Sequence, residues 1–396
     1  MALGDGFSPE KRIPWRLRKV DERFIGGNRI RLLRNGREAY PAMLEAIAAA
    51  REQVLLEMYW FDSDRIGRRF AAALCAAAER GVQVAVIYDA IGSLAAAPDM
   101  FEAMTASGVH VLEYNPVAPW KQRFRLAPLT RRDHRKILLI DGTVGFTGGL
   151  NIADQWLPEE QEGGGWRDDM VCVEGPAVRG FMRCFQQAWR SEGGPSLGPP
   201  RGFNSLPPGR SEVGGGRVRV LGEAHFRNHH AISRAYLSHL YRARSRAWLV
   251  NSYFIPDRRV LRALVRAARR GVDVRIIVPG ESDVPVVNWA SRAVWTRLLR
   301  RGVRLYQWTH GILHAKTAVI DGRWSTIGTF NLDHLSLRSN LEVNVTVLDE
   351  GFGQAMEAAF ERDLLECREV DAVAFRYRSL GDRLLELIAY RFRKFM

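Results

Sequence analysis

The side chains best suited to chemistry in this 396-residue sequence follow one pattern that occurs twice. The pattern is His-x-Lys-x4-Asp-Gly, and its polar members are His134, Lys136 and Asp141 in the first copy and His314, Lys316 and Asp321 in the second. Further along, Gly148 and Asn151 are matched by Gly328 and Asn331 at the same spacing of 180 residues. A single His-x-Lys pair is common by chance. Matched His, Lys, Asp, Gly and Asn at one spacing indicate a duplicated site.

Two histidines and two lysines suit displacement at the phosphorus of a phosphodiester. A neutral imidazole can attack phosphorus and form a covalent phosphohistidine. A protonated imidazole can donate to the departing oxygen and then act as base for the incoming hydroxyl. Lys136 and Lys316, with Asn151 and Asn331, can hydrogen-bond the non-bridging oxygens. Because one copy cannot supply both imidazole states, the pattern predicts that both copies share one active site.

The same residues argue against a metal centre. The duplicated pattern lacks a carboxylate cluster suited to Mg²⁺ and a Cys/His set suited to Zn²⁺. The histidines at 225, 229 and 230 precede an amphipathic pattern without a matching acidic set, so a surface or substrate-rim position is expected for them. We expect no metal and no other cofactor.

The elements that position the motifs can be read from the pattern. The apolar run after each Lys, followed by Asp-Gly and a second β-rich run, is typical of a hairpin. Residues i and i+2 of a strand share a face, so each His should project with its Lys. Asp141 and Asp321 would occupy the turns, where Asp-Gly is also a common pair for conformational reasons alone. We expect both aspartates to be scaffold rather than proton carriers.

Outside the motifs, each half repeats a strand-helix-strand order. Residues 54–89 and 248–279 each contain an apolar strand, an amphipathic helix and a second apolar strand, and Gly-Val pairs begin further strands at 108 and 302. Strands alternating with helices that end at Gly predict parallel crossover units in an α/β fold.

The chain divides at a segment rich in Gly, Pro and Ser. Residues 191–216 have this composition and are predicted to be a linker or mobile surface loop. The predicted first half is 1–190, the second is 217–370, and 371–396 is a basic amphipathic C-terminal segment.

Over nearly its whole length the sequence resembles the phospholipase D superfamily, and within it the bacterial cardiolipin synthases of the B type. The resemblance rests on HRKILLIDGTVGFTGGLN, SYFIPDRRVLRALVRAARRGVDVRIIVPGESD and HAKTAVIDGRWSTIGTFNLDHLSLRSNLEVNV. It implies two α/β/α halves with mixed sheets, related by a pseudo-two-fold axis. Thr329 departs from the Ser more often found there, although it keeps the hydroxyl.

The resemblance also implies roles for further residues. An acidic residue after each motif would orient a histidine, at the positions of Glu342 and Asp168, with Asp169 as the alternative to Asp168. The implied reaction transfers a phosphatidyl group from one phosphatidylglycerol to another and releases glycerol, with His134 as nucleophile and His314 as acid. Three alternatives remain: a hydrolytic phospholipase D, a nuclease of the same superfamily, and a membrane-binding module without activity. The intact duplicated side chains argue against the last.

The charge predicts an anionic partner. A formal charge of +14 and a pI near 10.1 suit either nucleic acid or an acidic lipid surface. The resemblance favours lipid, and nucleic acid is the less favoured partner. The N-terminus lacks the apolar region of a secretory signal, and no run of about 18 apolar residues occurs. We therefore expect peripheral association with the cytoplasmic face of a bacterial cell membrane.

The C-terminal segment supports two interpretations. Helical spacing places one apolar face along the segment, made of Leu384, Leu385, Ile388, Phe392 and Phe395. This face could lie in an anionic membrane interface, or it could pack on the domain.

Overall fold

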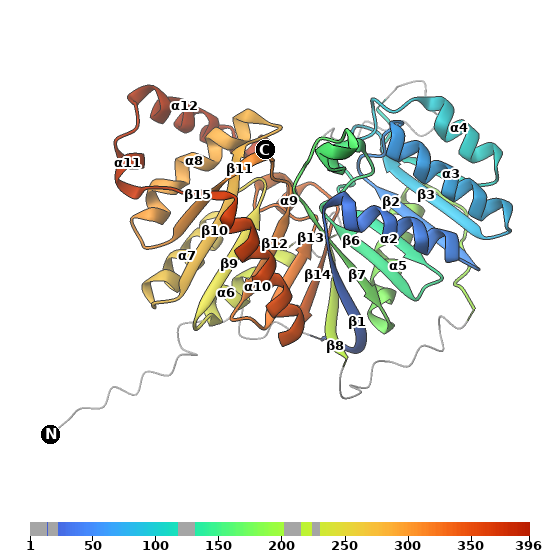
Figure 1. Ribbon diagram of the computed structural model, residues 1–396, viewed down its shortest axis with the longest axis horizontal. Helices are drawn as coiled ribbons and strands as arrows, with labels where there is room; N and C mark the ends of the chain where they lie inside the picture. Colours follow the sequence, from blue (N-terminus) through green and yellow to red (C-terminus); the bar gives the residue numbers. More distant parts are fainter. Residues whose placement is uncertain (1–13, 15–22, 118–130, 202–214, 224–229) are drawn as a thin grey trace.

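The computed structural model describes residues 14, 23–117, 131–201, 215–223 and 230–396. Within them a single 15-stranded sheet runs through the molecule, with helices on its outer faces (Figure 1). Its strand order is β15-β11-β10-β9-β12-β13-β14-β8-β1-β7-β6-β5-β2-β3-β4.

The first half contributes seven strands: β1 (Ile25–Arg34), β2 (Gln53–Met58), β3 (Gln83–Asp89), β4 (His110–Tyr114), β5 (Lys136–Ile140), β6 (Val144–Gly148) and β7 (Asp169–Glu174). Its longer helices are α2 (Asn35–Ala49), α3 (Arg65–Glu79), α4 (Pro98–Ala106) and α5 (Arg179–Ser191), and its short 3-10 helices are η2 (Asp154–Trp156), η3 (Glu159–Gln161) and η4 (Pro176–Val178). β2, β3 and β4 are parallel, whereas β5, β6 and β7 are antiparallel, so the sheet is mixed.

The second half repeats this plan with β8 (Gly216–Glu223), β9 (Arg246–Asn251), β10 (Asp273–Glu281), β11 (Arg304–Ile312), β12 (Lys316–Ile320), β13 (Trp324–Gly328), β14 (Glu342–Leu348) and an added edge strand β15 (Cys367–Glu369). Its helices are α6 (Ala231–Arg242), α7 (Arg258–Arg269), α8 (Pro285–Leu299), α9 (His334–Arg338) and α10 (Glu350–Leu365). The chain ends in α11 (Ala372–Arg376), α12 (Leu380–Arg391) and η6 (Arg393–Phe395).

The halves are related by a pseudo-two-fold axis at the centre of the sheet. β1 and β8 pair antiparallel there. Moving outward, the order β1-β7-β6-β5-β2-β3-β4 corresponds strand by strand to β8-β14-β13-β12-β9-β10-β11. The two sheet portions also pack together, since Val171 and Val173 share one buried cluster with Val343 and Val345. The predicted α/β class, with two mixed-sheet halves, is confirmed.

The crossover units form for local reasons. The residues of β2, β5 and β12 are buried along their whole length, as expected for strands covered on both faces. Asp64 caps α3 by accepting from the Gly67 amide, and Asp257 caps α7 by accepting from the amides of Arg259 and Val260. Each cap stands six residues after the end of its strand. The ends of β2 and β9 are thereby fixed beside the motifs.

The segment between the halves is packed where the structure describes it. Trp189 donates to the carbonyl of Pro195 at 2.8 Å, and Gln53 donates to the carbonyl of Gly198 at 2.8 Å. These contacts attach residues 192–201 of the predicted linker or mobile loop to the first half. Residues 202–214 of the predicted linker lie outside the described residues.

Among the described helices, none combines the length and apolar character that a membrane span requires.

Candidate active site

Each motif lies on a hairpin anchored by its aspartate. The turns at Asp141-Gly142 and Asp321-Gly322 have left-handed backbone angles, with φ of 47° and 64° in the first and 54° and 63° in the second. Two such residues define the hairpin turn that suits strand twist. The Asp141 carboxylate accepts from the backbone amides of residues 51–53, and Asp321 accepts from those of residues 244–246. Both aspartates thus tie the hairpin to the neighbouring strand, at the opposite end of β5 and β12 from the lysines.

His134 lies immediately before β5 and is held by the other half of the chain. Its amide donates to the carbonyl of Leu341 at 3.0 Å. Its Nδ1 lies 3.1 Å from Oε2 of Glu342, the first residue of β14. The histidine of the first motif is therefore oriented by a carboxylate from the second half.

His314 is held in the reciprocal way. Its amide donates to the carbonyl of Arg167 at 2.7 Å, and its Nδ1 lies 2.7 Å from Oδ2 of Asp168 in the first half. Asp169, the alternative from the sequence, instead forms an ion pair with Arg167 at 2.7 Å. Each half thus supplies the carboxylate that orients the histidine of the other half.

Both motif lysines are buried behind the histidines. Lys136 Nζ donates to the carbonyl of His134 at 2.9 Å, and Lys316 Nζ donates to the carbonyl of His314. Burial lowers the pKa of Lys136 to about 7 and the pKa of Lys316 to about 8, although nearby carboxylates favour the charged forms. The charge of these two lysines therefore depends on pH near neutrality.

Burial also sets the state of the imidazoles. Burial, together with the charge of Lys136, lowers the pKa of His134 to about 4 despite the attraction of Glu342. Burial and Lys316 lower the pKa of His314 in the same direction. Burial alone would raise the pKa of Asp168 and Glu342, but their histidine partners hold both carboxyl pKa values below normal. A neutral imidazole that donates from Nδ1 to a carboxylate presents the lone pair of Nε2 as its reactive atom.

The two histidines line one cavity of about 450 Å³, together with Asn151 and Asn331. The side-chain oxygen of Asn151 accepts from the Trp60 amide at 3.1 Å, and that of Asn331 accepts from the Ser252 hydroxyl at 2.8 Å. Since the oxygen of each amide is engaged, its NH₂ group is the end that can donate to a ligand. The arrangement brings two imidazoles and two amide donors to one cavity, where they could bind an anionic group.

The residues that support the carboxylates differ between the halves. A side chain at Gly149 would place its Cβ 2.1 Å from Asp168, so only glycine fits there. At the matching position the Thr329 hydroxyl donates to Glu342. Asp168 instead receives a hydrogen bond from Trp156 Nε1 at 3.0 Å. The hydroxyl that Thr329 shares with the more usual Ser therefore supports the Glu342 carboxylate.

The sequence analysis missed an aromatic wall on one side of the cavity. Trp60, Trp156 and Trp166 pack against one another, with ring centroids 4.9–6.1 Å apart. The ring centroid of His314 lies 5.4 Å from that of Trp156 and 5.8 Å from that of Trp166. This wall makes one side of the cavity apolar. The sequence indicated this wall only through the position of Trp166, which stands two residues before Asp168.

A pair of tyrosines completes the site. Tyr59 lies edge-on to His134 with centroids 5.0 Å apart, and Tyr253 lies edge-on to His314 at 6.4 Å. Tyr59 directly follows β2 and Tyr253 stands two residues after β9, and their spacing of 194 residues in the sequence could have identified them. His310 and His334 do not line this cavity.

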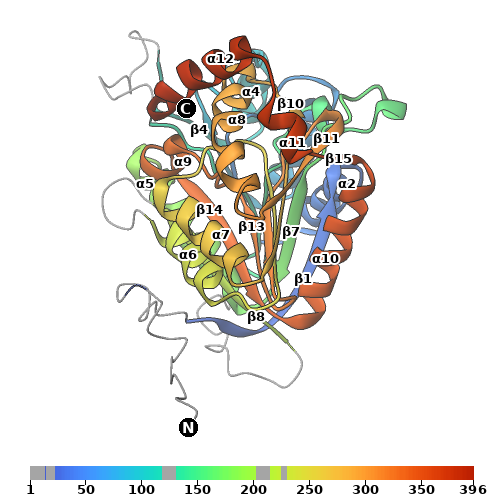
Figure 2. The same cartoon turned by 90° about the vertical axis from the view of Figure 1, so that its left-hand side faces the viewer.

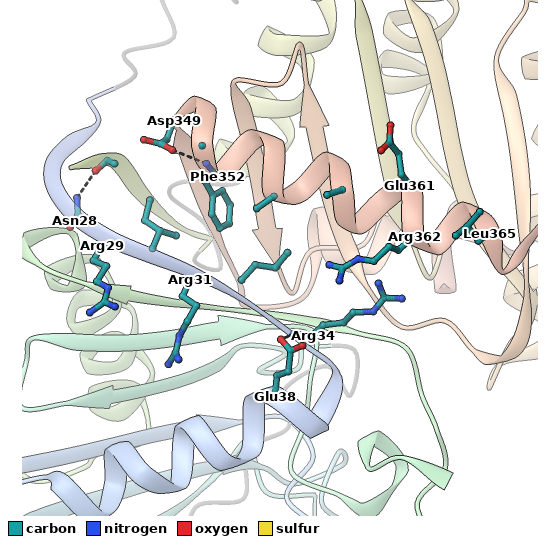
Figure 3. Close-up of a pocket in the computed structure, with 16 residues that line it drawn as sticks. Asn28, Arg29, Arg31, Arg34, Glu38, Asp349, Phe352, Glu361, Arg362 and Leu365 are labelled. Carbon is teal, nitrogen blue, oxygen red and sulfur yellow. Dashed lines mark hydrogen bonds between the residues drawn. The ribbon is translucent and has the colours of Figure 1, made fainter. Parts of the chain in front are cut away.

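A larger cavity of about 1020 Å³ lies elsewhere, between β1 and α10 (Figure 3). Arg29, Arg31, Arg34 and Arg362 line it above an apolar floor that includes Phe352. It contains neither motif, so its size does not make it the active site. In the described part of the chain, no group of three or more His, Cys, Asp or Glu side chains could hold a metal ion.

Comparison with known proteins places the chain in a family. The family described as "Cardiolipin synthase, PLD-like domain" matches residues 43–189 and 236–364. A cardiolipin synthase from Geobacillus sp. (strain WCH70) is 33% identical over 359 residues, which is 91% of this chain and 70% of the relative. Cardiolipin synthase B from Escherichia coli O6:H1 is 34% identical over 379 residues, which is 92% of this chain and 88% of the relative.

Solved structures show the same fold at low identity. Phosphatidylserine synthase from Haemophilus influenzae Rd KW20 superimposes with a TM-score of 0.73 at 11% identity and covers 98% of both chains. Polyphosphate kinase from Porphyromonas gingivalis gives a TM-score of 0.56 at 16% identity, covering 92% of this chain and 55% of that one. Together with the duplicated motifs, these matches show that the chain belongs to the cardiolipin synthase family, phosphatidyltransferases of the phospholipase D superfamily.

Proposed function

We propose that the enzyme makes cardiolipin by transferring a phosphatidyl group from one phosphatidylglycerol to another, with release of glycerol. One observation carries the proposal: His134 and His314 line the same cavity, and each is oriented through Nδ1 by a carboxylate of the opposite half. Two-step displacement at one phosphorus needs such a pair. The names of the relatives support the choice of lipid substrates.

In the first step, Nε2 of His134 attacks phosphorus while the bond from phosphorus to the glycerol oxygen breaks. His134 suits this role because its lowered pKa keeps it neutral. His314 donates a proton to the leaving oxygen. The substrate's own negative charge favours protonation of His314 when it binds, and the Asp168 carboxylate at 2.7 Å stabilises the imidazolium.

In the second step, the glycerol hydroxyl of another phosphatidylglycerol attacks the phosphohistidine. His314 removes the proton from that hydroxyl, the phosphorus–nitrogen bond breaks, and His134 returns to its neutral state. Asn151 and Asn331, which line the cavity, donate to the non-bridging oxygens in both steps, and the positive charges of Lys136 and Lys316, buried behind the histidines, stabilise the negative charge there. Asp141 and Asp321 support the hairpins and take no part in proton transfer.

We further propose that the enzyme works as a peripheral protein on anionic lipid, at the cytoplasmic face of a bacterial cell membrane. Its formal charge of +14 supports this placement. A neutral or acidic protein would gain no comparable attraction to such a surface.

The test is a product assay with labelled phosphatidylglycerol and purified enzyme. Cardiolipin and glycerol are expected in equal amounts, and His134→Ala and His314→Ala should each lower the rate by far more than about tenfold. Phosphatidic acid without cardiolipin would make the enzyme a hydrolytic phospholipase D. Cleavage of nucleic acid in place of lipid would make it a nuclease.

Rapid quenching followed by peptide mass spectrometry tests the covalent step. A phosphatidyl adduct is expected on the peptide that contains His134. An adduct on the peptide that contains His314 would exchange the two roles without changing the products.

A further inference from the structure

The C-terminal helix α12 packs on the molecule with its polar side inward. Glu386 is only 2% exposed, and its carboxylate accepts from Arg378 and Arg292 at 3.0 Å. By contrast, Leu384 is 59% exposed, Leu387 64% and Ile388 48%. A surface helix normally buries its apolar face against the core. In α12 this orientation is reversed, so its apolar face is available to something outside the described chain.

This helix lies beside the mouth of the active-site cavity. Ala389 of α12 belongs to a small buried cluster with Val287 of α8, and Tyr253, which lines the cavity, packs against that cluster. Leu335 also lines the cavity, and its amide donates to the carbonyl of the C-terminal Met396 at 3.1 Å. Both views place α12 at the end of the molecule opposite β8 (Figures 1 and 2).

Further exposed apolar side chains lie at or near the cavity. Val284 and Trp289, at the start of α8, are 37% and 44% exposed, and Val284 also lines the cavity. The first half contributes Ile91, which lines the cavity at 36% exposure, and Leu94, which is 72% exposed. We call these four residues and the outward face of α12 the apolar rim. Several exposed apolar side chains near the opening of one cavity indicate a binding surface.

A strongly basic groove adjoins the apolar rim. It lies between α7 and α8, has a volume of about 460 Å³, and is lined by Arg262, Arg266, Arg269, Arg297, Arg300 and Arg301. Ala293 and Thr296 line this arginine groove and also a second groove that contains Arg383 and Leu387 of α12. The basic surface is therefore continuous with the apolar helix. Cationic side chains beside an apolar helical face suit an interface of anionic headgroups and acyl chains.

We propose that the apolar rim and the arginine groove dock the enzyme on an anionic bilayer with the cavity mouth facing the lipid. The proposal rests on the proposed function, because only a lipid substrate requires a mouth placed against a bilayer. Docking in this orientation lets a headgroup enter the cavity while the acyl chains stay in the membrane. The apolar side chains of α12 and of the start of α8 enter the boundary between the lipid headgroups and the acyl chains. The arginines of the groove contact lipid phosphates beside them.

Vesicle flotation tests the surface directly. Wild-type enzyme should bind vesicles of phosphatidylglycerol and phosphatidylcholine, and bind weakly to phosphatidylcholine alone. Leu384→Ser/Leu387→Ser/Ile388→Ser should lower binding at least about tenfold, because each removes apolar area that enters the bilayer. Arg297→Gln/Arg301→Gln should weaken binding to the anionic vesicles and reduce its dependence on salt. The matched control is Leu365→Ser, since Leu365 is 84% exposed on α10 at the cavity of Figure 3, and it should bind within about twofold of wild type.

Dispersed short-chain phosphatidylglycerol separates docking from catalysis. On this substrate, below its micelle concentration, the triple variant should keep kcat/KM within about twofold of wild type. Unchanged vesicle binding by the triple variant would overturn the docking surface. So would a wild-type dimer that dissociates in the triple variant, since a second copy would then cover α12. Vesicle binding by wild type without any cardiolipin would instead overturn the proposed function and leave the docking surface intact.

Discussion

At the scale of single residues, the contact from Glu342 to His134 should determine whether the imidazole can attack. In Glu342→Gln the amide can donate to Nδ1, which would place the imidazole proton on Nε2 and remove the reactive lone pair. We expect kcat to fall by about 10- to 100-fold, the usual effect of losing such an orienting partner. Steady-state assays on dispersed substrate measure it. A value of kcat equal to wild type would refute the orienting role.

The hydroxyl of Thr329 offers a graded version of the same experiment. Thr329→Ser keeps the hydrogen bond to Glu342 and should leave kcat within about twofold, whereas Thr329→Val removes the donor and leaves a buried carboxylate oxygen without it. We expect Thr329→Val to lower kcat more than Thr329→Ser at equal thermal stability. Equal rates for the two variants would show that the hydroxyl does not act through Glu342.

The lowered pKa values of the lysines predict a pH profile. As pH rises past about 7 and about 8, Lys136 and Lys316 lose their protons and with them the positive charge that stabilises the transition state. As pH falls toward about 4, His134 takes up a proton and loses its lone pair. The value of kcat/KM, which reports the free enzyme, should therefore be highest between about 5 and 7. A rate that still increases at pH 9 would contradict this assignment.

At the scale of elements, the motif aspartates should contribute to stability and not to chemistry. Asp321→Ala removes the acceptor for the amides of residues 244–246 and should lower the free energy of unfolding by about 1–3 kcal/mol. Because these hydrogen bonds lower the pKa of Asp321, its stabilisation is present at neutral pH and is lost on acidification through the folded-state pKa. Urea unfolding measures the change, with exposed Glu102→Ala as control. A large loss of kcat in fully folded Asp321→Ala would contradict the scaffold role.

The elements were predictable where their signals are local. The hairpins follow from Asp-Gly between apolar runs, and the crossover units from strand, helix and Gly in a fixed order. The exchange of Asp168 and Glu342 between halves was not predictable, because 146 and 208 residues separate these carboxylates from their histidines. The spacing of α12 predicted its apolar face but not its outward orientation, since the same spacing fits a buried face. Composition indicated a linker or mobile loop over residues 191–216 but not the hydrogen bonds of Pro195 and Gly198 to the first half, because composition does not reveal packing.

At the scale of the whole molecule, a buried ion network should hold the two halves in the relative position that the His134–Glu342 and His314–Asp168 pairs require. Arg167 is 1% exposed and is bound by Asp169 of its own half and by Asp363 of α10 at 2.8 Å. Arg34 shares Asp363. Arg167 also lies next to Asp168, and its carbonyl receives the amide of His314. A movement of α10 relative to the first half would therefore also move His314 and Asp168.

Removing Asp363 should consequently damage both stability and catalysis. Asp363→Ala removes the carboxylate that pairs with both Arg34 and Arg167 in a buried site. The free energy of unfolding should therefore fall by about 3–5 kcal/mol. In the molecules that still fold, displacement of Arg167 should also displace His314, whose amide donates to the Arg167 carbonyl. Phosphohistidine formation should then be slower, because His314 donates a proton to the leaving oxygen in that step. Urea unfolding and single-turnover quenching measure the two effects. Glu361→Ala, two residues earlier on the exposed side of α10, should change neither. Wild-type stability in Asp363→Ala would mean that the central sheet and core alone fix how the halves meet.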